Sequence, residues 1–384
     1  MSRVPNCCLP VLLAGLLAGA SFADEEPASA LSARRMTDAA TAFVALLDDG
    51  QRHKAMLPLE SGGRTVWSNL PVFFVPPNGI YVSELDDAQK AAMHDLLRAS
   101  MSAQGYAKMA GIMRLDDILR DLTAEQLKTN PDMRKDPLWH ALGATYTSGN
   151  YTVAIFGDPG SANWGWKLDG HHLGANFTVS GDRVGFTPTF LGSNPMRVPG
   201  GPYAGWMALP QEGDRGIELM RSLTEEQREQ ATVSAELPAD IFEGPGLRGS
   251  LDEHEGIKAA GLTVSQMRLL RALVREYVAN LDFDAADAQL RLIDESGWEE
   301  LWFSWRGPVD PAGRFYYRVH GPRLLIEYNR QDANHDHSIV RDPANDYGED
   351  WLQRHYREYH PTISEVMESG RKQAEQEFGE ALRQ

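Results

Sequence analysis

The sequence predicts an α+β fold, in which an antiparallel sheet of β-hairpins is flanked by several helices. Two separated segments, 151–192 and 300–329, are rich in aromatic and β-branched residues and contain turn sequences such as SGDR and DPAG. The segments before, between and after them show helical periodicity. Because the strands come in adjacent pairs and not singly between helices, this order favours antiparallel hairpins over a doubly wound parallel sheet.

Residues 1–23 have the composition of a secretory signal peptide. Arg3 supplies a positive charge, residues 9–20 form an apolar run, and small residues lead up to Ala23. The run is shorter than the ~20 residues that a membrane-spanning helix needs. We therefore expect cleavage near Ala23, a flexible leader over residues 24–35, and a periplasmic or secreted bacterial protein.

The only two cysteines, Cys7 and Cys8, lie inside this predicted signal peptide. A chain cleaved near Ala23 has no cysteine, which excludes disulfides, a thiolate nucleophile and Cys-ligated metal sites. Any metal ligands must therefore be His, Asp or Glu.

The formal net charge of −17 argues against nucleic acid and anionic membranes as partners. Beyond the predicted signal peptide no stretch approaches the ~18 consecutive apolar residues of a membrane span. We expect no span, and we treat residues 36–384 as a single α+β domain.

Helical segments are expected in several parts of the chain. Residues 37–57 have an apolar face, the longest helix should follow Thr263, and two C-terminal helices should cover residues 346–360 and begin at Thr362. A motif, Leu-Thr/Asp-x-x-Gln, marks helix starts because Thr or Asp at the N-cap and Gln three residues later form a capping box. It occurs four times, at residues 85–89, 122–126, 223–227 and 262–266. Since this spacing is irregular, we interpret the copies as helix starts and not as the repeat of a solenoid.

Several common enzyme signatures are absent. The sequence HEGIK at 254–258 lacks the second histidine of a zinc helix, and neither Gly-x-Ser-x-Gly nor a Walker loop occurs. The sequence GPGLRG at 244–249 matches Gly-x-Gly-x-x-Gly, but it does not follow a predicted strand and is better explained as a turn.

Four histidines form the best candidate site. His335 and His337 alternate in an extended segment, so both side chains can reach one ion. His171 and His172 are adjacent, and the nearby glycines 170 and 174 would allow a bulge that turns both inward. Together the four would suit one transition metal ion, zinc or copper and less well iron. The alternative is that the two pairs lie apart and make separate hydrogen bonds.

Glu327 and Arg341 are the candidate catalytic residues. Glu327 interrupts the apolar strand LLIEYN, where it would act as a general base, a further ligand or a partner of Arg323. Arg341 would bind an anionic substrate, or form a salt bridge with Asp342.

These residues also carry a family resemblance. The segments GWKLDGHHLGANFTV, TPTFLGSNP and GPRLLIEYNRQDANHDHSIVRDPANDYG resemble the bacterial family known as domain of unknown function 3500, over roughly residues 36–360. The resemblance implies one exported module and no established activity. Arg330 and Asp336 depart from the family's pattern and put a charge beside His335.

The sequence therefore leads to three hypotheses, in order of preference. The first is a metal-dependent enzyme acting on a small-molecule substrate, by hydrolysis with zinc or by oxidation with copper or iron. The second is a periplasmic protein that binds a metal or small ligand without catalysis. The third is an interaction protein whose histidines only hold a loop. If His172 and His335 lay more than ~10 Å apart, no single ion could bridge them, because each Zn–N bond is about 2 Å.

Overall fold

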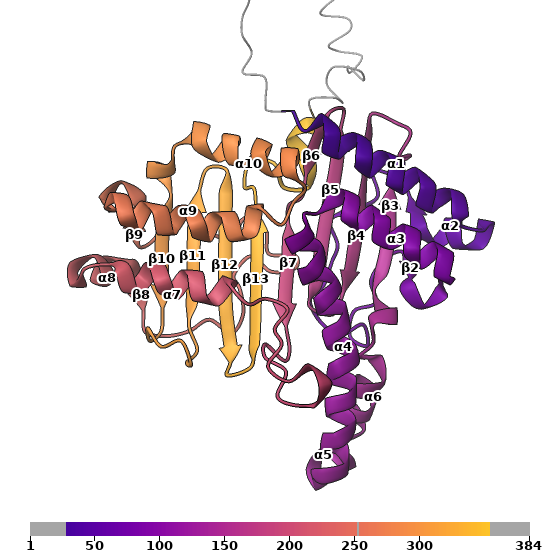
Figure 1. Cartoon of the computed structure of the whole chain (residues 1–384), viewed down its shortest axis with the longest axis horizontal. Coiled ribbons are helices and arrows are strands. Elements are labelled where there is room, and N and C mark those ends of the chain that lie inside the picture. The colour runs from indigo at the N-terminus through magenta and orange to yellow at the C-terminus, as the bar shows by residue number, and fades with distance from the viewer. Residues whose placement is uncertain (1–27, 252, 354–384) are drawn as a thin grey trace, which may run out of the picture.

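The computed structural model describes residues 28–251 and 253–353 of the 384-residue chain. Within these residues the strands form one mixed 13-stranded sheet, and the long helices cross one side of it (Figure 1). The predicted α+β class is confirmed, but the expectation of a purely antiparallel sheet was wrong. Two short edge strands, β1 and β8, run parallel to their neighbours β3 and β10. In each case two long helices lie in the chain between the edge strand and its parallel neighbour, so the two strands are joined by a crossover and not by a hairpin.

The order of the sheet is β1-β3-β4-β5-β7-β13-β12-β11-β10-β8, with β2 beside β3, β6 beside β5 and β9 beside β10. The strands are β1 (Met56–Leu57), β2 (Ile80–Tyr81), β3 (Thr152–Phe156), β4 (Asn163–Gly170), β5 (Leu173–Ser180), β6 (Arg183–Gly185), β7 (Thr189–Ser193), β8 (Thr232–Ser234), β9 (Ile257–Lys258), β10 (Trp302–Arg306), β11 (Tyr316–Gly321), β12 (Leu324–Asp332) and β13 (His335–Arg341).

The α-helices are α1 (Ala30–Leu46), α2 (Asp49–Ala55), α3 (Asp87–Ser100), α4 (Ala103–Thr129), α5 (Pro131–Lys135), α6 (Pro137–Thr145), α7 (Glu212–Ser222), α8 (Glu225–Ala231), α9 (Val264–Val278) and α10 (Phe283–Ser296). Short 3-10 turns are η1 (Gly62–Arg64), η2 (Val82–Glu84), η3 (Ser148–Asn150), η4 (Gly201–Tyr203), η5 (Ala259–Gly261), η6 (Trp298–Glu300) and η7 (Asp346–Gly348).

The chain is built from two similar halves. The series α2-β1-β2-α3-α4-β3-β4-β5-β7 is repeated as α8-β8-β9-α9-α10-β10-β11-β12-β13, with the same strand pairings. The last strands of the two halves, β7 and β13, pair antiparallel at the centre of the sheet. A pseudo-two-fold axis therefore passes between β7 and β13, so the chain contains a two-fold repeat and not a solenoid.

The helix-start motif belongs to this repeat. Capping boxes begin α3, α8 and α9, as predicted, and a further one at Asp48 begins α2. In each half the two box glutamines pair side chain to side chain, Gln51 with Gln89 and Gln227 with Gln266. The motif at 122–126 is not a helix start, because it lies inside α4. At 27 residues, α4 is also longer than the 15-residue α9 that we expected to be longest.

The halves differ most after α4. The matching helix α10 ends at Ser296 and leads through Gly297 directly into η6. By contrast α4 continues to Thr129, and α5 and α6 follow before η3. Residues 117–147, which we call the arm, extend below the sheet in Figure 1. The arm is therefore an insertion in the first half only.

The two faces of the sheet have different coverings. One face packs against helices: Trp164 of β4 donates to Thr37 of α1, and Tyr317 of β11 lies against Gly216 of α7. The other face is covered by irregular chain, residues 58–79 and 235–256, where Trp67 and Ile241 join a small apolar cluster with strand residues including Phe190 and Ile339. Because alternate residues share a face, Gly192, His337 and Arg341 lie under the irregular segments.

Among the described residues, no helix combines the length and apolar character that crossing a membrane would require. The predicted signal peptide, the remainder of the helix predicted at 346–360 beyond residue 353, and the helix predicted from Thr362 lie outside the described residues.

The paired glutamines should contribute measurably to stability. The buried side chain of Gln266 accepts the Thr263 N–H and donates to the carbonyl of Ser222. We expect Gln266→Ala to lower the free energy of unfolding by about 1–3 kcal/mol, because both backbone groups lose their partner. Urea denaturation would measure this. The control is Gln126→Ala, an exposed residue in the copy of the motif within α4, which should change stability by less than ~0.5 kcal/mol. Equal losses in both variants would contradict the assignment.

Candidate metal centre

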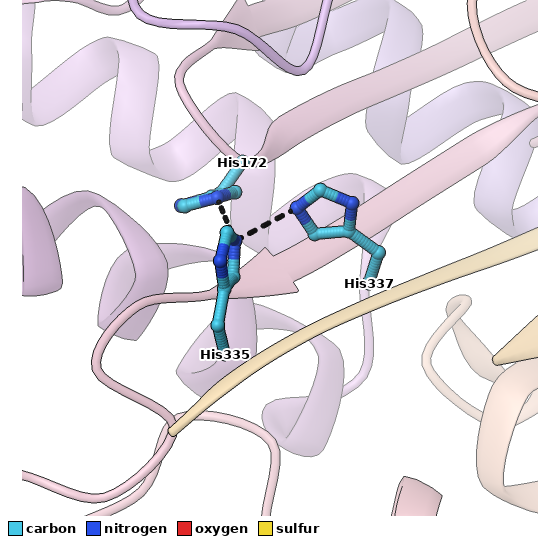
Figure 2. A group of neighbouring side chains, drawn as sticks. All are labelled: His172, His335 and His337. Atoms are coloured by element: carbon cyan, nitrogen blue, oxygen red, sulfur yellow. Dashed lines mark hydrogen bonds between the residues drawn. The ribbon is translucent and has the colours of Figure 1, made fainter. Parts of the chain in front are cut away.

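Three of the four predicted histidines converge. His172 lies in the turn between β4 and β5, and His335 and His337 begin β13. The Nε2 atom of His335 is 2.9 Å from Nε2 of His172 and 3.0 Å from Nε2 of His337 (Figure 2). Ligand atoms of all three lie within 4.8 Å of one another. The two sequence segments are therefore close enough for the three side chains to hold a metal ion.

The register of β7 brings these segments together. His337 of β13 faces Gly192 of β7, and the Gly192 N–H donates to the carbonyl of His172 at 2.8 Å. A Cβ atom at position 192 would lie 2.9 Å from Cδ2 of His337 and 3.0 Å from Cδ2 of His172. Only glycine leaves both rings enough room here, and the sequence contains no signal for this requirement.

The turn that carries His172 is tight. Gly170 pairs with Leu173, so His171 and His172 form a two-residue connection and not the bulge that we expected. His172 has a φ of 60°, one of two positive φ values at non-glycine positions in the described residues. A left-handed backbone conformation at a non-glycine residue costs of order 1 kcal/mol. It persists only where contacts with the surrounding structure stabilise it.

His171 does not join the three converging nitrogens. Its Nδ1 lies 2.6 Å from Oδ1 of Asp116 on α4, and both side chains are buried. Asp116, His171 and His172 form a second group whose ligand atoms lie within 4.8 Å of one another. The expected four-nitrogen site is therefore a three-nitrogen cluster with a neighbouring Asp–His pair.

The three nitrogens are poorly matched as hydrogen-bond partners. Nδ1 of His337 lies 2.7 Å from the Asp240 carboxylate, an acceptor, so we assign a proton to Nδ1. Its Nε2 faces Nε2 of His335. Nε2 of His335 has two nitrogen neighbours but one hydrogen or one lone pair, so it cannot satisfy both. A cation among three lone pairs would remove this mismatch.

Electrostatics favour neutral rings. Burial, together with the other three histidines, lowers the pKa of His172 well below its ordinary value of 6.5. Burial, followed by His337 and His171, lowers the pKa of His335 to about 3. Burial alone would raise the pKa of Asp240, but the hydrogen bond and charge interaction with His337, together with hydrogen bonds from the Ile241 N–H and Asn69, outweigh burial and lower the pKa. Neutral imidazoles near an ionised carboxylate are in the protonation states that metal binding requires.

Both irregular segments support the cluster. Asp240 from residues 235–256 holds His337, and it also accepts a hydrogen bond from Nδ2 of Asn69 at 3.2 Å. The carbonyl of Asn69 accepts the His172 N–H at 3.3 Å. A carboxylate that orients a ligand histidine through its second nitrogen is a frequent feature of metal sites. Sequence reasoning missed Asp240 and Asn69, because nothing marks these two loop residues as neighbours of the histidines.

Access to the cluster is uneven. His172 and His337 are 4% and 5% exposed, whereas the side chain of His335 is 19% exposed. The cluster is therefore nearest to solvent at His335.

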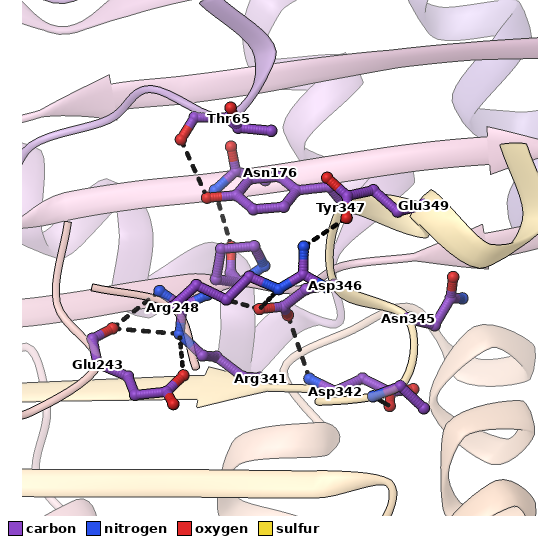
Figure 3. A network of polar contacts seen from close by, with 12 residues as sticks. Thr65, Asn176, Glu243, Arg248, Arg341, Asp342, Asn345, Asp346, Tyr347 and Glu349 are labelled. Atoms are coloured by element: carbon purple, nitrogen blue, oxygen red, sulfur yellow. Dashed lines mark hydrogen bonds and ion pairs between the residues drawn. The ribbon is translucent and has the colours of Figure 1, made fainter. Parts of the chain in front are cut away.

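The structure does not bring Glu327 and Arg341 into this cluster. The buried Glu327 carboxylate accepts the N–H groups of Phe242 and Glu243, at 2.7 and 2.8 Å, and the Tyr316 hydroxyl at 2.7 Å. Arg341 donates to Asp346 at 2.5 Å and to the carbonyl of Glu243 at 2.8 Å (Figure 3). Both hold the irregular segment against the sheet, so we give neither a role in catalysis. The proposed Glu327–Arg323 pair does not occur in these contacts, whereas Arg323 and Asp342 form an ion pair at 2.8 Å.

We expect Glu327→Gln to lower the free energy of unfolding by about 1–3 kcal/mol. The amide would turn an N–H₂ group toward one of three donors and leave it unsatisfied in the interior. Chemical denaturation would measure the loss, and metal content should equal that of the wild-type protein. A folded, equally stable variant with altered metal content would contradict this structural role.

The depressed pKa of His335 predicts a pH dependence for chelator-treated protein. Between its ordinary value of 6.5 and about 3, the unfolded chain binds a proton at this residue that the folded chain does not. The free energy of unfolding should therefore fall as the pH is lowered through this window. Urea midpoints near pH 7 and pH 5 would measure the fall, and His335→Gln should make it smaller. An unchanged fall in the variant would show that other groups cause it.

Comparison with known proteins places the chain in a family. The family model described as "Protein of unknown function (DUF3500)" matches residues 29–349, which include all three converging histidines. No curated protein and no solved structure matches the chain. The match confirms the resemblance seen in the HH and HDH segments, and the chain belongs to the DUF3500 family of proteins of unknown function.

Proposed function

We propose that the protein binds one transition metal ion through the Nε2 atoms of His172, His335 and His337. The observation that carries the proposal is the convergence of three imidazoles in which Nε2 of His335 faces two other ring nitrogens and cannot hydrogen-bond to both. In a tetrahedral site, metal–nitrogen bonds of about 2.0–2.1 Å place ligand nitrogens roughly 3.3 Å apart, close to the 2.9 and 3.0 Å that separate Nε2 of His335 from Nε2 of His172 and of His337.

The donor set suits zinc or copper. Zinc bound by three histidines keeps a fourth position for water or substrate, which is the pattern of catalytic and not structural zinc sites. Iron is less favoured, because its common protein site combines two histidines with a carboxylate, and no carboxylate belongs to this three-histidine group among the described residues.

An open position would make the centre a catalyst for a small-molecule substrate. With zinc, the reaction would be hydrolysis by a metal-activated water; with copper, it would be an oxidation. Because His335 is the exposed ligand, a substrate would approach from its side.

The second candidate is a protein that binds a metal or small ligand without turnover. One observation favours it: Glu327, the candidate base, is fully engaged by Phe242, Glu243 and Tyr316. Turnover then has to rely on the ion and its bound water, without help from this carboxylate.

The proposal includes export from the cytoplasm, supported by the charged and apolar composition of residues 1–23. N-terminal sequencing of protein from a bacterial periplasmic fraction tests it: a first residue near Asp24 supports export, and an intact Met1 refutes it.

Elemental analysis tests the metal itself. Untagged protein, purified without chelator, should carry about one zinc or copper per chain, and His335→Ala/His337→Ala should lose it because two of three ligands are gone. The control is His53→Ala, an exposed histidine on α2, which should keep the ion. Absence of metal from the wild-type protein, even after incubation with Zn²⁺ or Cu²⁺, would refute the proposal.

A further inference from the structure

The turn that carries His172 is held from the helical side by a polar clamp. Asp116 of α4 contacts Nδ1 of His171 at 2.6 Å through Oδ1. The Tyr151 hydroxyl lies 3.1 Å from Oδ2 of Asp116 and 2.6 Å from the carbonyl oxygen of His171. Asp116 and Tyr151 together fix both the ring and the backbone of His171, and all three residues are buried.

The clamp reaches the converging nitrogens through stacked rings. Tyr146, at the end of the arm, stacks on His171 with centroids 5.2 Å apart and planes at 25°. His171 in turn lies against His172 with centroids 3.8 Å apart. His172 then contacts the rings of His335 and His337. A continuous path of contacts thus runs from α4 and the arm to the proposed ligands.

The second half of the chain provides an internal comparison. The matching turn is Pro322 and Arg323, closed by the pair Gly321 and Leu324. It has no histidine, and Arg323 forms an ion pair with buried Asp342 instead. The matching helix α10 ends at Ser296, where α4 continues into the arm. The turn can therefore form without an Asp–His clamp. Of these two turns, the clamp occurs only at the turn of the first half, which carries the proposed ligand His172.

We propose that Asp116 is a positioning residue that acts through His171 to hold the imidazole of His172 in place for metal binding. This inference rests on the proposed metal site. His172 has an unfavourable backbone conformation, and a ring fixed in advance binds an ion more tightly because less freedom is lost on binding. Residues that orient a ligand in this way typically contribute 10–100-fold to metal affinity.

The experiment measures Zn²⁺ affinity by competition with a chromophoric chelator, and visible absorption after Co²⁺ substitution. Asp116→Asn should weaken Zn²⁺ binding by roughly 10–100-fold and shift the Co²⁺ spectrum. His171→Ala should do the same. The double variant should be no weaker than His171→Ala alone, because Asp116 acts through that ring.

The matched control is Asp342→Asn, which removes the buried carboxylate at the equivalent turn of the second half. It should lower the urea midpoint and leave Zn²⁺ affinity and the Co²⁺ spectrum unchanged. If Asp116→Asn does not fold, His171→Ala and Tyr151→Phe still test the clamp, and Tyr151→Phe should give a smaller loss in the same direction.

The outcomes separate the two proposals. Wild-type protein that binds neither Zn²⁺ nor Co²⁺ refutes the metal site itself. Wild-type binding with unchanged affinity and spectrum in Asp116→Asn and His171→Ala refutes the positioning role alone. Two further outcomes would make these residues metal ligands and overturn the positioning role. One is two ions bound by the wild-type protein but one by Asp116→Asn, and the other is loss of all metal binding in His171→Ala.

Discussion

The antiparallel pairing of β7 with β13 is the constraint on which the rest of the structure depends. It joins the two halves of the sheet, and it sets His337 opposite Gly192. Gly192 is hydrogen-bonded to the turn at His172, so the same pairing brings together histidines that are 163 positions apart in the sequence. A shift of one residue would move His337 to the helical face of the sheet. The same strand pairing therefore both joins the two halves and forms the candidate site.

Burial of polar groups follows from how the second face is covered. Irregular chain cannot satisfy its own backbone groups, so the strands beneath it supply charged and polar partners. Glu327 and Arg341 do this for the segment around Glu243. Glu327 became a candidate for catalysis because it interrupts an apolar strand, although the hydrogen-bonding needs of the covering segment explain its position. An odd charge in a strand thus indicates buried backbone as readily as a reactive centre.

The sequence predicted the α+β class and the histidines, because both depend on local pattern. His335 and His337 alternate on a strand, and their common direction follows from strand geometry alone. The partners of these residues, Asp240 and Asn69, could not be predicted, since they come from irregular segments whose path is set by tertiary contacts. The repeat was missed for a related reason. DGHHLGANF and HGPRLLIEY occupy equivalent places, yet they share only a glycine and a leucine.

The two-fold relation gives each position a counterpart that has folded under nearly the same constraints. His172 and Arg323 sit in equivalent turns, and each is fixed by a different acid, the first through His171 and Asp116 and the second directly by Asp342. The turn of the second half shows that the fold forms without an Asp–His pair, and the turn of the first half has that pair in addition. The second half therefore serves as an internal reference, against which the residues particular to the histidine end can be recognised.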